Sequence, residues 1–201
     1  MPYSTYLGGE RIQCPSPEEE SARRGVLVNI DPKAYAAKPD HSSGETGRVS
    51  NRLMSQAPSV VAAGELAGAI SSGRAFLPSV HAGKRSPETW AAQQLFCIDV
   101  DNDAETLKRC GHLLPIDEGV MRSQLLGLPL LISYWSFSAS EGNDRYRLLF
   151  ALDEPTQDKA RAVEFGAALL AAYPEADQTS TQLNRLFFGT NKEVQLWAPA
   201  M

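Results

Sequence analysis

The stretch Leu95-Phe-Cys-Ile-Asp-Val-Asp101 decides how the chain is interpreted. It is apolar and contains β-branched residues, a composition that favours a strand. Because side chains alternate along a strand, Asp99 and Asp101 are expected on one face, about 7 Å apart. Ile98 and Val100 then point into an apolar layer on the other face. The stretch therefore predicts a buried strand that ends in two carboxylates.

Elements of alternating type follow this strand. Leucine spacing predicts a helix over 104–114. Aromatic and β-branched runs predict strands over 129–138 and 145–152, joined by a turn at 140–144. An alanine-rich pattern predicts a second helix over 156–173. A fourth strand is expected over 183–190 and a short fifth over 194–198. The order β-α-β-β-α-β is that of an α+β, ferredoxin-like (RRM-like) core. Its strands would lie in the order fourth, first, third, second, with the first antiparallel to both neighbours.

The N-terminal part has a different texture. Frequent Pro and Gly residues predict an irregular arm over 1–47 with one or two short strands, around the apolar run 26–30, packed on the rest. Residues 48–201 are expected to form the catalytic domain. Within it, the apolar spacing of 61–70 indicates a helical lead-in that stops at Gly73.

Composition narrows the classes of protein. The 201 residues carry 19 Lys and Arg against 24 Asp and Glu, a net charge of −5. Three cysteines without a CxxC pair argue against a zinc site or a disulfide framework. No apolar run approaches the roughly 20 residues that span a bilayer, so we expect a cytoplasmic protein with no membrane partner. The negative net charge does not suggest binding to nucleic acid, but it does not exclude a local basic groove that binds it.

The predicted topology brings polar residues from four segments to one sheet edge. Besides the acidic pair, these are Ser136, Ser138, Arg145, Arg147, Asp177, Asn184 and Arg185. Clustered carboxylates predict a Mg²⁺ or Mn²⁺ site, and Arg side chains offer planar, bidentate donors to a triphosphate. The simpler alternatives are a solvated strand end that leads into a helix cap at Asp103, a solvated Arg-Tyr-Arg face, and a turn-capping role for Asp177.

The runs IDVDND, YWSFSASEGNDRYRLLFALDEP and NRLFFGTN, in this order, resemble the archaeo-eukaryotic primase superfamily, in particular the primase-polymerase domains of plasmids, phages and other mobile elements. The resemblance covers roughly residues 48–195. It implies a DNA-directed primase or polymerase, active in replication of a mobile element or in defence. It also implies metal-binding, catalytic Asp99, Asp101 and Asp177, with nucleotide contacts from Ser136, Ser138, Arg147 and Arg185. Arg145 and Asn184 are further candidates for nucleotide binding because they lie at the same sheet edge. The implied partners are a single-stranded DNA template, NTP or dNTP, and a helicase module in the same or a neighbouring chain.

One position departs from the family pattern and leaves an alternative open. The second motif of the family carries a histidine where this chain has Ala139, so a nearby Arg or Lys84 would have to contact the phosphate. The alternative is a catalytically degenerate primase-like domain that binds DNA or nucleotide in a replication initiator. A phosphatase of the haloacid dehalogenase type is disfavoured by the element order. For an active enzyme, Asp99→Ala or Asp101→Ala is expected to abolish synthesis and leave the fold intact.

Overall fold

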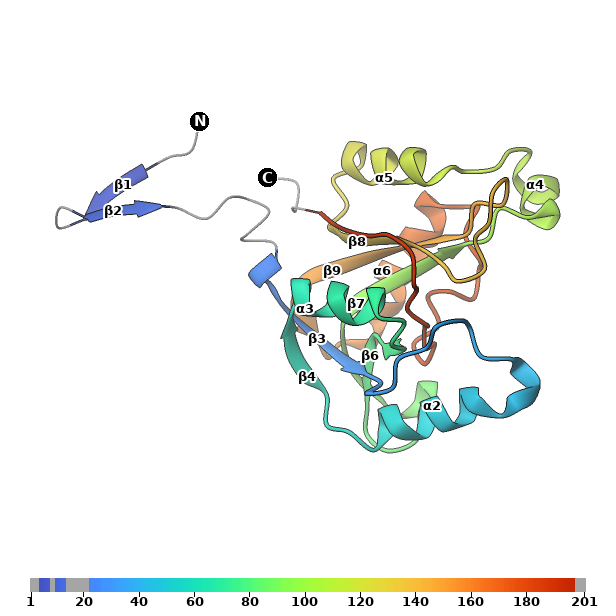
Figure 1. Cartoon of the computed structure of the whole chain (residues 1–201), viewed down its shortest axis with the longest axis horizontal. Coiled ribbons are helices and arrows are strands. Elements are labelled where there is room, and N and C mark those ends of the chain that lie inside the picture. Colours follow the sequence, from blue (N-terminus) through green and yellow to red (C-terminus); the bar gives the residue numbers. More distant parts are fainter. Residues whose placement is uncertain (1–3, 8–9, 14–21, 198–201) are drawn as a thin grey trace.

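The fold is α+β, as the element order predicts (Figure 1). It was obtained as a computed structural model, which describes residues 4–7, 10–13 and 22–197. A five-stranded antiparallel sheet lies at its centre. In spatial order its strands are β10 (Val194–Leu196), β8 (Leu130–Trp135), β9 (Tyr146–Thr156), β7 (Trp90–Val100) and β6 (Ser79–His81). The predicted adjacency of the first strand to the third, and of the third to the second, is therefore confirmed.

The register of the sheet brings the predicted motifs together. Asp99 of β7 lies opposite Arg147 of β9, which in turn lies opposite Tyr134 of β8. The turn between β8 and β9 is closed by a bridge from Ser140 to Asn143. The polar ends of three strands thus meet at one edge.

The predicted fourth strand over 183–190 is wrong. Among the described residues of this segment, the only β-pairing is an isolated bridge from Phe187 to Phe76. The position beside β7 is taken by β6, whose Ser79 also donates a hydrogen bond to the carbonyl of Leu183. The predicted fifth strand exists as β10, but it pairs with β8 at the opposite edge; residue 198 of that prediction lies outside the described residues.

One face of the sheet is covered by helices. They are α5 (Ile116–Leu125) and α6 (Lys159–Ala172), whereas α4 (Ala104–Cys110) follows the end of β7. Phe96, Ile98 and Val100 of β7 pack in the core on this face. The helix predicted over 104–114 ends early because Gly111 adopts a left-handed conformation (φ 78°), and α5 was not predicted.

The other face of the sheet is covered by the N-terminal half, opposite α5 (Figure 1). Helix α3 (Ala63–Ser71) and a three-stranded sheet of β4 (Ser59–Ala62), β3 (Gly25–Ile30) and β5 (Phe76–Leu77) pack against Leu95 and Cys97. The remaining elements are the hairpin β1 (Ser4–Leu7) and β2 (Glu10–Gln13), α2 (Glu45–Met54), and two 3₁₀ turns at His41–Ser43 and Pro87–Thr89. Helix α2 crosses the boundary proposed at 47/48. No helix of the described residues is long and apolar enough to cross a membrane.

Gly189 lies where two backbone segments approach closely. A Cβ at this position would lie 2.4 Å from the carbonyl oxygen of Ile70 and 2.7 Å from that of Arg74. We expect Gly189→Ala to lower the free energy of unfolding by about 2 kcal/mol, as for other overpacked sites. In the control, Gly68→Ala, the exposed Gly68 of α3 has no atom within 4 Å of the added Cβ, so stability should stay equal or rise. Equal urea midpoints for Gly189→Ala and wild type would contradict this prediction.

Candidate functional site

Asp99 is held in a buried ion pair. Its side chain is 8% exposed, and its two oxygens accept from Arg147, Nε to Oδ1 at 3.1 Å and Nη2 to Oδ2 at 3.2 Å. Arg147 also donates to the carbonyl of Phe188 at 2.6 Å and to the hydroxyl of Tyr134 at 3.2 Å. Burial alone would lower the pKa of Arg147, but Asp99 and Tyr134 raise it well above its usual value. The guanidinium is therefore charged and fixed.

Arg185 connects two of the predicted carboxylates. Its Nη2 lies 3.4 Å from Oδ2 of Asp99, and its Nη1 lies 2.7 Å from Oδ2 of Asp177. The backbone N–H of Asp177 donates to the carbonyl of Asp99 at 2.8 Å. Asp177 also caps a turn by accepting from Thr179. Burial alone would raise the pKa of Asp177, but the contacts from Thr179 and Arg185 lower it.

Asp101 and Arg145 form a looser pair at the same edge. The Asp101 carboxylate is 37% exposed and lies 3.5 Å from the Arg145 guanidinium. Burial, with a further contribution from Asp99, raises the pKa of Asp101. Asp103 caps α4 by accepting from the N–H of Thr106, as expected.

Two cavities adjoin these pairs. The larger, about 340 Å³, is lined by Lys38, Thr46, Arg85, Asp99, Arg147, Gln182, Asn184, Arg185, Leu186, Phe187 and Phe188. The other, about 250 Å³, is lined by Asp101, Asp103, Glu105, Thr106, Arg109, Asp177 and Gln178. We call the larger one the basic cavity, because four cationic side chains line it against one carboxylate.

The predicted serines lie outside both cavities. Ser136 is buried and Ser138 is exposed in the turn after β8. The Lys192 ammonium contacts the carbonyl oxygens of Phe137 and Ala139 in this turn. A lysine thus stabilises the turn at the place where the family carries its histidine, and the serines have no contact that favours a nucleotide-binding role.

The three carboxylates are not arranged as metal ligands. Asp99, Asp101 and Asp177 each contact an arginine side chain. Within the described part of the chain, no group of three or more His, Cys, Asp or Glu side chains is placed to hold a metal ion. The residues therefore do not fit the implied Mg²⁺ or Mn²⁺ in this arrangement, and no catalytic step through a metal follows from it.

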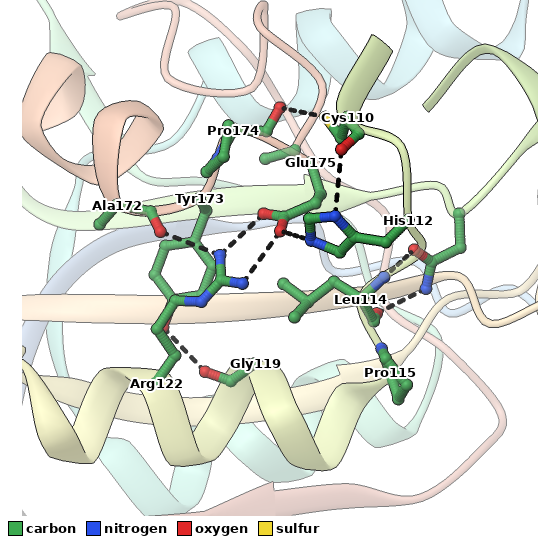
Figure 2. A network of polar contacts seen from close by, with 12 residues as sticks. Cys110, His112, Leu114, Pro115, Gly119, Arg122, Ala172, Tyr173, Pro174 and Glu175 are labelled. Carbon is green, nitrogen blue, oxygen red and sulfur yellow. Dashed lines mark hydrogen bonds and ion pairs between the residues drawn. The ribbon is translucent and has the colours of Figure 1, made fainter. Parts of the chain in front are cut away.

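A buried network positions the loop that carries Asp177. Figure 2 shows the Glu175 carboxylate between the Arg122 guanidinium and the His112 imidazole. Glu175 is 1% exposed, and its oxygens lie 2.8 and 2.9 Å from Arg122 nitrogens and 2.7 Å from Nε2 of His112. Arg109 donates to the carbonyls of Pro174, Glu175 and Ala176. Helices α4 and α5 thereby fix the loop two residues before Asp177.

Several residues of the basic cavity were not predicted from the sequence. Lys38 and Thr46 belong to the segment for which no function was proposed, and Arg85 and Gln182 lie in loops. Lys84, the residue considered for the phosphate contact, is exposed and does not line the cavity. The sequence carries one weak signal for Arg85, which is its place a few residues before the strand that carries Asp99.

Comparisons with known proteins add one structural likeness. No family model matches the chain, and no curated protein matches it. Among solved structures, the chain is similar to the AEP domain of the primase-polymerase (PrimPol) of cyanophage S-2L, with 10% sequence identity and a TM-score of 0.41. The similarity covers 90% of this chain and 85% of that one. At these low values, a proposal on function has to rest on the site itself.

The burial of Asp99 corrects the expectation that Asp99→Ala leaves the fold intact. Removing the carboxylate leaves the buried Arg147 cation without its partner, so the free energy of unfolding should fall by about 3 to 5 kcal/mol. Asp101→Ala, which removes a half-exposed partner, should cost less than about 1 kcal/mol. In urea denaturation, the double variant Asp99→Ala/Arg147→Met should be more stable than Asp99→Ala. A double variant no more stable than the single one would contradict the ion-pair argument.

Glu175 makes the stability depend on pH in the acid range. Burial alone would raise its pKa, but hydrogen bonds from Arg122, the backbone and His112 more than offset this and lower it from 4.5 to about 2. A carboxylate with a depressed pKa stabilises the fold above pH 4.5 and loses that contribution as pH falls toward 2. Between pH 5 and pH 3 the loss should be about 2 kcal/mol. Glu175→Gln should reduce this pH dependence by that amount, and an unchanged slope would refute the assignment.

Proposed function

We propose that this chain is a primase-polymerase-type domain that binds a nucleoside triphosphate in the basic cavity and uses it for nucleotidyl transfer on single-stranded DNA. The observation that carries the proposal is the meeting of Arg147, Asn184 and Arg185 with Asp99 around one cavity. These residues come from three separate segments of the resembling motifs. The guanidinium groups of Arg147 and Arg185 are suited to binding phosphate oxygens, because they stay charged and donate hydrogen bonds in a planar fork.

A second candidate function is binding without synthesis, as in a replication initiator. The arginine contacts to Asp99, Asp101 and Asp177 favour it, since carboxylates paired in this way contribute to stability rather than to chemistry. Ala139 favours it as well. The same basic cavity would bind the nucleotide in either case.

The remaining parts of the proposal come from the motif resemblance. They are a single-stranded DNA template, NTP or dNTP as substrate, a helicase module as partner, and a role in a plasmid or phage; the divalent metal that the resemblance implies is supplied in the assay below. The acidic pair at the strand end and the arginines beside it are compatible with nucleotide chemistry, and activity assays can separate the two candidates.

The decisive assay incubates the protein with single-stranded DNA, labelled NTPs or dNTPs, and Mg²⁺ or Mn²⁺, followed by gel analysis. Asp101→Asn is the better probe, because Asp101 is half-exposed and its loss should not unfold the protein. Product should fall at least tenfold in Asp101→Asn. The control Asp153→Asn, at a fully exposed carboxylate, should behave as wild type.

Three outcomes are informative. Equal product from Asp101→Asn and wild type would remove Asp101 from the mechanism. Absence of product from the wild type, with nucleotide binding retained, would favour the binding-only initiator. Absence of both product and nucleotide binding would refute the proposal.

A further inference from the structure

The cationic side chains of the basic cavity differ in whether a carboxylate matches them. Arg147 is paired with Asp99, and Arg185 with Asp177 and Asp99. For Lys38 and Arg85, no acidic side chain of the described residues lies within ion-pair distance. The four cations are therefore matched by two carboxylates, Asp99 in the cavity and Asp177 outside it, and the two unmatched charges lie outside the motifs that suggested the function.

Arg85 is fixed in place without being neutralised. Its Nε donates to Oγ of Ser50 on α2 at 2.9 Å, and its guanidinium donates to the carbonyl of Asn184. Both partners are neutral groups, so they orient the side chain and leave its charge unbalanced. A partly buried, oriented guanidinium is a strong site for an anion, because little conformational freedom remains to be lost on binding.

Lys38 is carried by a firmly anchored segment. Asp31, fully buried, accepts two hydrogen bonds of 2.8 Å from Arg52 of α2, and Tyr35 donates to Glu45 at 2.7 Å. The Tyr35 carbonyl packs on Gly73, where a Cβ would lie only 1.9 Å from its oxygen.

A further contact, from the Asn191 side chain to the carbonyl of Ala36 at 3.1 Å, lies two residues before Lys38. These contacts hold the segment that leads to Lys38 against α2 and against the residues around Gly73 and Asn191. Lys38 itself is exposed and lines the cavity.

We infer that Lys38 and Arg85 are the phosphate-binding residues of the basic cavity, which makes the N-terminal segment a part of the nucleotide site. Arg147 and Arg185 are already paired with Asp99 and Asp177, so Lys38 and Arg85 supply the positive charge that no carboxylate of the site balances. This inference rests on the proposed function, because it names the groups that hold the triphosphate of the same nucleotide. It also assigns the phosphate contact that the family histidine, here Ala139, does not supply.

The test measures binding of ATP and of inorganic tripolyphosphate by the full chain, using isothermal titration calorimetry without divalent metal. Lys38→Gln and Arg85→Gln should each weaken binding of both probes about tenfold or more, the usual effect of losing one charged hydrogen bond. Arg85→Lys should recover part of the affinity. Lys84→Gln, which removes an exposed cation from the neighbouring position, is the matched control and should bind as wild type.

Lys38 is exposed, so its variant remains informative if Arg85→Gln fails to fold. Wild-type affinity in Lys38→Gln, or an equal loss in Lys84→Gln, would overturn this inference and leave the proposed function standing. Absence of binding of both probes to the wild type would overturn the proposed function and the inference with it. Loss in Lys38→Gln alongside normal binding in Lys84→Gln would support it.

Discussion

The rest of the site depends on the buried pair of Asp99 and Arg147. The two residues lie opposite each other on adjacent strands, and both charges are buried, so each requires the other as a partner. Their pairing fixes Arg147 against the carbonyl of Phe188, and so fixes the segment that follows Arg185. The cavity wall, the loop of Asp177 and the end of the sheet are all positioned relative to this one contact.

Much of this edge could be predicted from the sequence. The β-α-β-β-α-β order places the end of the first strand beside the start of the third, and the structure puts Asp99 opposite Arg147 as that order requires. Asp103 as a helix cap followed from local chemistry alone. Such predictions succeed when topology or a single turn determines the contact, because few other arrangements satisfy the pattern.

Other parts depend on contacts between distant segments. Strand β6 has only three residues, which is too short for a periodic pattern in the sequence. It is a strand because it pairs with the edge of β7. Arg85 reaches the cavity through Ser50 and Asn184, which lie 35 and 99 residues away. Helix α5, in contrast, is indicated by local sequence, because Pro115 precedes it and its first turn carries acidic residues.

The replacement of the expected fourth strand has a consequence for behaviour at high concentration. The central sheet is bounded on both sides by strands of three residues, β6 and β10. Short outer strands expose few unpaired N–H and C=O groups, which are the template for pairing between copies of a chain. The long strand β9 lies inside the sheet, and the short outer strands disfavour self-association through sheet extension.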